Sequence, residues 1–229
     1  MRTKIPAVIM RGGTSRALFF KKDDLPDDTC KWESLFLSAL GSPDSTGRQI
    51  DGLGGGVSSN SKVAVISPSV DSRYDLVYYF GQVAVDKPHV DFTGNCGNIS
   101  SAVAPFAIDE GLVPAVEPIT TVRIHQQNTD KLIIAKVKVE NGKFQEAGDY
   151  TIPGNNGTGS RITLHFVDPG GSLTGKLLPT GNVLDVLKDV ADLGDIECSI
   201  VDAGNPLIFI DADQLGIDVL DISQFDEDL

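Results

Sequence analysis

Cysteine and positive charge are both scarce in this sequence, and each shortage excludes a class of protein. The 229 residues include three cysteines, Cys30, Cys96 and Cys198, which stand far apart and form no CxxC pair. This argues against a disulfide framework or a zinc site and predicts a reducing compartment, the cytoplasm. The 19 Lys and Arg residues face 32 Asp and Glu residues, giving a net charge of −13, so we expect no nucleic-acid-binding surface.

Long apolar runs and several familiar catalytic motifs are also missing. No run is long enough for a membrane-spanning helix, and the N-terminus lacks the apolar region of a signal peptide, so we expect no membrane association. The three histidines are scattered, which argues against a metal site built from them. A Gly-x-Ser-x-Gly elbow is absent, which argues against a Ser-His-Asp hydrolase. The glycine-rich stretch 52–56 leads into a strand rather than a helix, which argues against a phosphate-binding loop.

The sequence does contain 24 glycines and 12 prolines between short apolar segments, which indicates many turns and short strands. Apolar residues recur at helical spacing over residues 98–110, with Gly111 as a stop signal and Pro105 as an expected kink or break. Other expected elements are strands at 62–67, 75–80 and 82–85 and a helix at 183–190. The mixed order of strands around one well-marked helix predicts an α+β fold.

The most distinctive stretch is Gly94-Asn95-Cys96-Gly97-Asn98, which directly precedes the predicted helix. The first N–H groups of a helix lack intrahelical partners and favour an anion, either a substrate carboxylate or the thiolate of Cys96. The same surroundings make a cysteine more reactive. The alternative is that Cys96 is a small buried apolar residue and that the glycines only permit a turn. The residues alone leave both interpretations open.

Lys62 lies 34 residues before Cys96, where the polar segment Ser58-Ser59-Asn60-Ser61 meets an apolar strand. A lysine in this place is either a solvated surface cation or, if desolvated, a base that works near neutral pH. Hydroxyl and amide groups of the polar segment could hold a carboxylate in front of it. The turn from Arg11 to Arg16 carries two guanidinium groups and two hydroxyls, and it is either a surface turn or a carboxylate clamp.

These stretches occur in one order with several others between about Ile5 and Ile210. The others are Gly41-Ser42-Pro43-Asp44, Gln49-Ile50-Asp51-Gly52, Phe106-Ala107-Ile108, Gly111-Leu112-Val113, Leu178-Pro179-Thr180-Gly181-Asn182 and Asp202-Ala203-Gly204-Asn205-Pro206. Together with Met10-Arg11-Gly12-Gly13-Thr14-Ser15, they resemble the PrpF family. That family comprises the 2-methylaconitate isomerases and their relatives for 3-methylitaconate, aconitate and oxalomesaconate.

The resemblance implies a diaminopimelate-epimerase-like fold. Two similar domains would each wrap a mixed or antiparallel sheet around a central helix, with the active site in the cleft between them. The first domain is expected over residues 1–193, with its central helix near 98–110. Residues 194–229 are expected to begin a second, pseudo-symmetric domain that is incomplete in this chain. No metal, nicotinamide or pyridoxal cofactor is expected.

The resemblance also implies roles for individual residues. Lys62 and Cys96 match the acid/base pair that flanks the substrate in this family. Arg16 stands where many relatives carry lysine, which keeps the charge but changes the contact geometry. The candidate substrate-binding residues are Arg11, Thr14, Ser15, Arg16, Ser58, Ser59, Asn60, Ser61, Asn95, Gly97, Asn98 and Asn205.

The implied activity is a cofactor-independent isomerase of small unsaturated tricarboxylates. The closest reaction is cis-trans isomerisation of 2-methylaconitate by allylic proton abstraction and return. The alternatives are isomerisation or tautomerisation of aconitate, methylitaconate or oxalomesaconate, and a non-catalytic truncated or accessory form with exposed apolar surface. An amino-acid epimerase needs a cysteine pair across the cleft, and only Cys96 lies in a suitable motif. The expected partner is a polycarboxylate substrate, and a homo-oligomer is left open.

Overall fold

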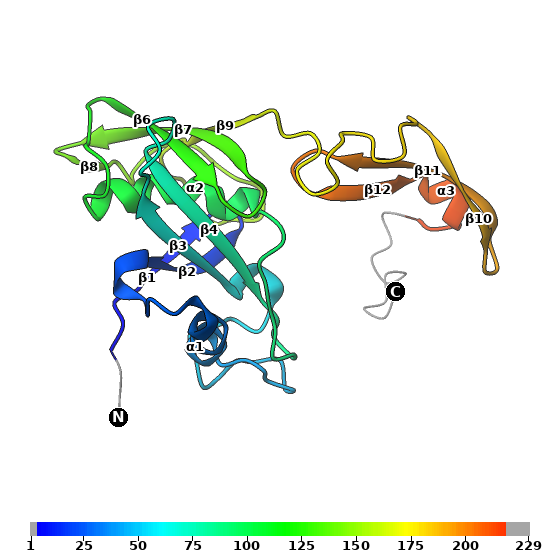
Figure 1. Ribbon diagram of the computed structural model, residues 1–229, viewed down its shortest axis with the longest axis horizontal. Helices are drawn as coiled ribbons and strands as arrows, with labels where there is room; N and C mark the ends of the chain where they lie inside the picture. The colour runs from blue at the N-terminus through cyan, green and yellow to red at the C-terminus, as the bar shows by residue number, and fades with distance from the viewer. Residues whose placement is uncertain (1–3, 219–229) are drawn as a thin grey trace. The chain divides into compact units, whose positions relative to one another are not determined.

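The computed structural model describes residues 4–218 as two compact units, which divide between Asp168 and Pro169 (Figure 1). The sequence analysis placed the boundary at 193/194, which falls at the tip of a hairpin inside the second unit. The division comes earlier because the residues before 194 pair with the strand that follows them. None of the described helices is long and apolar enough to cross a membrane.

The first unit is built on one nine-stranded mixed sheet in the order β1-β2-β3-β4-β6-β7-β8, with β5 paired to β4 and β9 paired to β7. The pairs β2–β3 and β4–β6 are parallel and the other pairs are antiparallel. The strands are β1 (Val8–Gly12), β2 (Ser15–Lys21), β3 (Lys62–Pro68), β4 (Leu76–Val83), β5 (Val90–Asp91), β6 (Ile119–Gln126), β7 (Lys131–Glu140), β8 (Lys143–Phe144) and β9 (Thr163–Val167).

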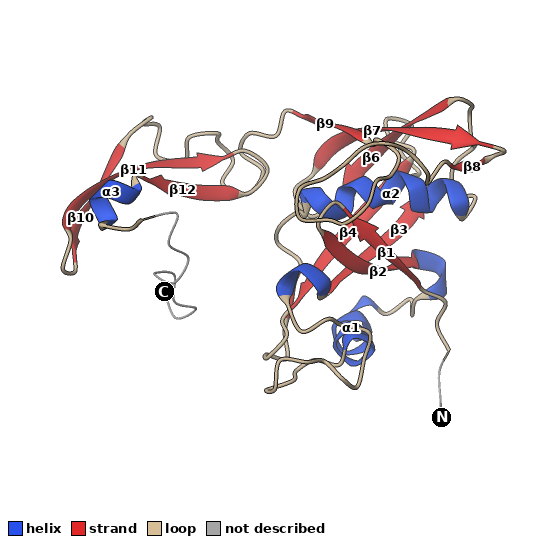
Figure 2. Ribbon diagram, turned by 180° about the vertical axis from the view of Figure 1, so that it is seen from behind, coloured by secondary structure: helices blue, strands red, loops and turns tan. Residues whose placement is uncertain are grey.

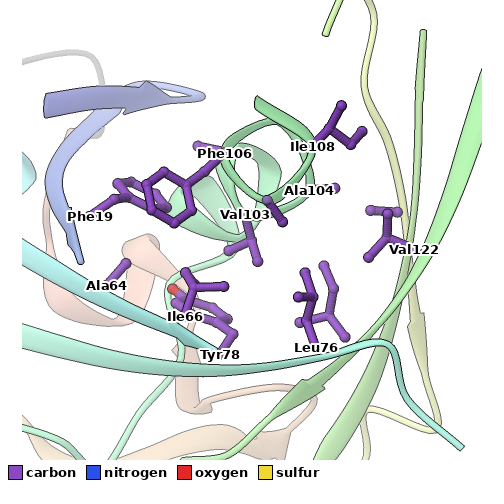
Figure 3. Packing of buried hydrophobic residues seen from close by; sticks show 14 of the residues in the cluster. Phe19, Ala64, Ile66, Leu76, Tyr78, Val103, Ala104, Phe106, Ile108 and Val122 are labelled. Atoms are coloured by element: carbon purple, nitrogen blue, oxygen red, sulfur yellow. The ribbon is translucent and has the colours of Figure 1, made fainter. Parts of the chain in front are cut away.

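The sheet curls around α2 (Gly97–Asp109), the helix predicted at 98–110 (Figure 2). Nearly every residue of α2 from Ile99 to Ile108 is buried, as a helix enclosed by a sheet requires. Figure 3 shows Phe106 of α2 against Phe19 of β2, with 5.3 Å between ring centroids. The helix continues across Pro105, so the expected break does not occur.

The opposite face of the sheet is covered by α1 (Trp32–Leu40). Its buried residues Trp32, Phe36 and Leu40 repeat every four positions and therefore share one side of the helix. They pack in a second core with Leu18 of β2 and Val63 of β3. Their strand neighbours Phe19 and Ala64 belong to the core around α2, because successive side chains of a strand point to opposite faces.

Two predictions of secondary structure were wrong. Residues 75–80 and 82–85 were expected to be separate strands, but β4 is continuous from Leu76 to Val83. Gly81 lies within it because an added Cβ would come 2.8 Å from a Val63 methyl group, so close packing needs glycine there. Residues 183–190 were expected to form a helix, but β10 (Asp185–Val190) is a strand. It pairs with β11, and this tertiary pairing outweighs the local preference.

The second unit contains an antiparallel sheet in the order β10-β11-β12 and a short helix. Its further elements are β11 (Gly194–Asp202), β12 (Pro206–Ile210) and α3 (Ala212–Leu215). Asp202 at the end of β11 is fully buried and accepts hydrogen bonds from the loop at 172–174. This carboxylate is the polar centre of the second unit.

Candidate active site

Lys62 is the first residue of β3 and lies on the same face as Ala64, toward α2. Only 7% of its surface is exposed. Its Nζ donates a hydrogen bond to Oε1 of Gln82, which is the residue directly opposite on β4. Nζ also lies 5.7 Å from the centroid of the Phe80 ring. Lys62 is therefore a buried lysine held by specific contacts, and the alternative of a solvated surface cation is wrong.

The surroundings of Lys62 make its proton easier to remove. Burial removes water from the ammonium group and lowers the pKa of Lys62, because a charged group loses more hydration than a neutral one. The charge of Cys96 opposes this effect and raises the pKa, but burial is the larger influence. This interaction also places the amine and the thiol within electrostatic reach of each other.

Cys96 is the N-cap residue of α2, in an extended conformation, and its side chain makes no capping hydrogen bond with the described residues. Its carbonyl oxygen accepts from the Ser100 amide and hydroxyl, both at 2.9 Å. The Ser100 hydroxyl also lies 3.1 Å from Oδ1 of Asn95. These contacts fix the backbone on both sides of the thiol. The half-buried thiol thus sits at the positive end of the central helix.

Tyr78 of β4 lies beneath this helix start and was not anticipated from the sequence. It is fully buried, and its hydroxyl forms no hydrogen bond of normal geometry with the described residues. Burial raises the pKa of Tyr78 well above its ordinary value, the charge of Cys96 raises it further, and the neighbouring Ser100 hydroxyl acts in the opposite direction. Tyr78 therefore stays neutral and contributes a polar group below Cys96 without adding charge.

The turn between β1 and β2 packs directly against the start of α2. Asn98 donates from Nδ2 to the Thr14 hydroxyl at 3.1 Å and accepts from the Thr14 amide at 3.5 Å. An added Cβ on Gly12 would come 2.5 Å from the Asn98 carbonyl oxygen, so only glycine permits this approach. A cavity of about 500 Å³ beside this contact is lined by Arg11, Gly13, Gly97 and Asn98, among others. Several of the predicted substrate-binding residues therefore line one cavity.

The long loop before Lys62 is fastened by Gln49, which the sequence analysis did not single out. Gln49 is 1% exposed, donates from Nε2 to the hydroxyls of Ser42 and Ser61 at 2.8 and 2.7 Å, and accepts from the Gly56 amide at 3.0 Å. The Ser61 hydroxyl is thereby used inside the protein. Arg16 is directed to the same loop, donating to the Leu53 carbonyl at 3.4 Å.

The remaining candidates fall in different places. Ser15 is buried, and Ser58 is exposed. Ser59 and Asn60 are half-buried within the short 3₁₀ turn Ser58–Asn60. Asn205 belongs to the second unit. Among residues 4–218, no three His, Cys, Asp or Glu side chains gather as a metal site.

Comparison with known proteins supplies the family. A family model described as PrpF protein matches residues 2–228. The chain is 48% identical over 229 residues to the 3-methylitaconate isomerase of Eubacterium barkeri, covering 99% of this chain and 59% of that protein. It is 42% identical over 224 residues to the 2-methyl-aconitate isomerase of Cupriavidus necator, covering 93% of this chain and 56% of that protein. The chain thus spans less than two thirds of these curated relatives.

Solved structures supply the fold. The crystal structure of methylitaconate-delta-isomerase matches with a TM-score of 0.76 and 50% identity, covering 93% of this chain and 54% of that one. A hydroxyproline epimerase from Agrobacterium vitis matches with a TM-score of 0.58 at 16% identity, covering 95% of this chain and 55% of that one. That second likeness concerns the fold alone. The α+β, diaminopimelate-epimerase-like fold predicted from the sequence is confirmed.

Proposed function

The chain belongs to the PrpF family, and from this premise we propose that it carries the acid/base half of a proton-transferring isomerase for small unsaturated di- and tricarboxylates. One observation carries the proposal. Lys62 is buried within electrostatic reach of Cys96, the N-cap of α2, and burial lowers the pKa of its ammonium group. A lysine that releases its proton readily, next to the N–H groups of a helix start, suits removal of a proton alpha or vinylogous to a carboxylate.

The proposed reaction moves one proton across an allylic unit. Lys62 removes a proton from the carbon next to the double bond, and the electron pair spreads into the conjugated carboxylate. Backbone N–H groups at the start of α2 stabilise this charge. The proton then returns to the other end of the allylic unit, or to the original carbon after bond rotation. The reaction is redox-neutral and consumes no co-reactant, so its balance requires no cofactor.

Cys96 is proposed as the second acid/base group or as the group that orients the substrate. Arg11 and Thr14 beside the cavity at the helix start are proposed to contact substrate carboxylates, because guanidinium and hydroxyl groups bind such anions well. The proposed first substrate is 2-methylaconitate. Methylitaconate is the nearest alternative, supported by the higher identity to the methylitaconate isomerases.

Deuterium exchange followed by NMR tests this function. The chain alone, and the chain fused to the part of the Eubacterium barkeri relative that it does not match, are incubated in deuterated water with 2-methylaconitate, 3-methylitaconate or trans-aconitate. We expect deuterium to enter at the allylic carbon of at least one substrate. If neither form exchanges or isomerises any of them, the isomerase proposal is rejected.

Two substitutions test the assigned residues in whichever form is active. Lys62→Ala is expected to lower kcat by about 10²-fold or more, the usual contribution of a positioned acid or base. The exposed Lys138→Ala is the matched control. Cys96→Ser is expected to lower kcat as well, with the exposed Cys30→Ser as its control. Near-full activity of Lys62→Ala contradicts the base assignment, and near-full activity of Cys96→Ser leaves the thiol without a chemical role.

A non-catalytic binding role is the second candidate, and one observation favours it. The β12 residues Leu207, Ile208 and Phe209 are each more than half exposed. Leu207 and Phe209 share one face of the strand, and exposed apolar residues on one face mark a surface that binds another surface. Sizing chromatography with light scattering tests it. Concentration-dependent association that is lost in Phe209→Ser supports the binding role, and a monomer at all concentrations contradicts it.

A further inference from the structure

We infer that Gln82 is the positioning residue of Lys62: its neutral side-chain amide orients the lysine amine toward the helix start and leaves that amine free to lose its proton. The inference rests on the proposed function of Lys62 as a base. Gln82 appears in none of the motifs that identify the family in this sequence, and its side-chain amide donates to the backbone carbonyl oxygens of Ser58 and Ser61 in the loop before Lys62.

The Gln82 amide has one orientation that satisfies its neighbours. Its Nε2 donates to the carbonyl oxygens of Ser61 at 2.9 Å and Ser58 at 3.1 Å. Its Oε1 accepts from Nζ of Lys62. In the flipped orientation, Oε1 would face two carbonyl oxygens and Nε2 would face an ammonium group. Carbonyl oxygens cannot donate and ammonium groups cannot accept, so the flipped amide would lose every one of these bonds.

The backbone holds Gln82 as firmly as the side-chain contacts do. Gln82 is paired with Lys62 on one side and with Asp91 of β5 on the other. Residues directly opposite in an antiparallel pair have Cβ atoms about 5 Å apart, so the amide reaches Nζ without a change of backbone. Lys62 is therefore fixed at its base by β3 and at its tip by the amide.

The neutral charge of Gln82 is as important as its shape. The elements around Lys62 carry these titratable or charged residues: Arg16 and Lys21 on β2, Tyr78 and Tyr79 on β4, Asp91 on β5, Asp109 on α2 and Cys96 at the N-cap of α2. Of these, Cys96 is the one whose charge raises the pKa of Lys62. A glutamate at position 82 would add a negative charge in direct contact and would keep the proton on the amine. A glutamine orients the amine without adding a charge that holds the proton on it.

A direct titration of Lys62 tests the inference without any activity assay. The chain is labelled with ¹³C-lysine, and the Lys62 Cε signal is assigned by its loss in Lys62→Arg and followed by NMR against pH. In Gln82→Glu, which is nearly isosteric, we expect the titration midpoint of Lys62 to rise by about one to three pH units, as an opposite charge in contact predicts. In Gln82→Met, which adds no charge, we expect the midpoint to stay at or below that of the unsubstituted chain.

The control is Gln127→Glu, which adds the same charge at an exposed position lining a cavity on the α1 side of the sheet. It is expected to leave the midpoint unchanged. If Gln82→Glu leaves the midpoint where it was, or if Gln127→Glu moves it equally, the inference is overturned. Circular dichroism and thermal unfolding of each variant show whether the fold is kept. If Gln82→Glu does not fold, the kinetics of a folded Gln82→Met variant still test the inference.

Kinetics in an active form separate positioning from mere structural support. A base must be unprotonated to act, so a raised midpoint moves the rising limb of the pH–rate profile of Gln82→Glu to higher pH, and its activity recovers there. Gln82→Met is expected to lose about tenfold in kcat, with a smaller change in KM, because the amine loses its orientation. The rising limb of its pH–rate profile should not move to higher pH, because methionine adds no charge. Wild-type kcat in both variants overturns the inference. A midpoint shift in a protein without isomerase activity refutes the proposed function and not the Gln82–Lys62 contact.

Discussion

Lys62 carries a charge that the fold makes costly. Its amine is buried against Phe80 and near Cys96, with the Gln82 amide as its hydrogen-bond acceptor. A core residue of similar length without charge would pack in the same place without this desolvation cost. A lysine kept here despite that cost is characteristic of a functional site, where stability and chemistry compete.

The lowered pKa of Lys62 gives a testable dependence of stability on pH. Between the lowered folded-state pKa and the ordinary value of 10.5, the unfolded chain binds more protons at Lys62 than the folded chain does. Stability at this residue therefore rises with pH across that window and is lower below it. Compared with Lys62→Met, the unsubstituted chain should gain stability as pH increases toward 10.5.

Urea unfolding at several pH values between 7 and 10 measures this difference. Lys138→Met, which removes an exposed lysine of β7, is the matched control and should run parallel to the unsubstituted chain. Parallel curves for Lys62→Met as well would mean that burial does not alter the proton affinity of Lys62.

Among the elements, the contact between the β1–β2 turn and α2 decides the shape of the site. Gly12 and Gly13 let the turn reach the first residues of the helix, where Asn98 is joined to Thr14 by hydrogen bonds. Gly13 has a φ of +50°, a conformation that residues with a side chain rarely adopt. Gly12 and Gly13 thus allow the close approach of the turn to the start of α2, and the side-chain amide of Asn98 joins the two by hydrogen bonds.

Gly12→Ala tests this contact. The new Cβ would lie 2.5 Å from the Asn98 carbonyl oxygen and 2.9 Å from the Ile99 Cα, both backbone atoms that cannot move alone. We expect a loss of about 1–3 kcal/mol in the free energy of unfolding, as overpacking of a buried contact typically costs. Gly159→Ala is the control, since its nearest neighbour would be 3.7 Å away. Equal unfolding free energies for the two variants would show that the turn adapts freely.

For the molecule as a whole, the two compact units are stabilised by different means. The first has two apolar cores on the two faces of its sheet. The second leaves the β12 side chains exposed and centres on the buried carboxylate of Asp202. Burial opposes the ionisation of Asp202, but hydrogen bonds from Thr174, Leu173 and Ser172 outweigh it and hold the pKa of this carboxyl far below its ordinary range.

Asp202→Ala should therefore loosen the second unit selectively. The variant removes the carboxylate that accepts the hydrogen bonds from residues 172–174, and a hydrogen bond to a charged group contributes about 1.5–3 kcal/mol. Hydrogen exchange followed by mass spectrometry should show faster exchange in β10, β11 and the 172–174 loop, with protection in β3, β4 and α2 unchanged. Asp213→Ala, at an exposed position of α3, is the control. Equal acceleration in both units would contradict their separate stabilisation.

The sequence by itself determined the elements whose signals are local. The apolar period over 98–110 predicted α2, and the apolar run after Lys62 predicted β3. The order of short motifs identified the family and its fold. Lys62 and Cys96 could be selected because each stands out against its neighbours as a reactive side chain in an otherwise small or apolar segment.

Only the tertiary structure decided what depends on partners distant in the chain. Gln82 looks like an ordinary polar residue of a strand until β4 pairs with β3 and places its amide against Lys62. Residues 185–190 became a strand, and the units divided after Asp168, because β11 offered a hydrogen-bonding edge to β10. The lowered pKa of Lys62 likewise arises from burial, since desolvation depends on what covers a side chain and not on its neighbours in sequence.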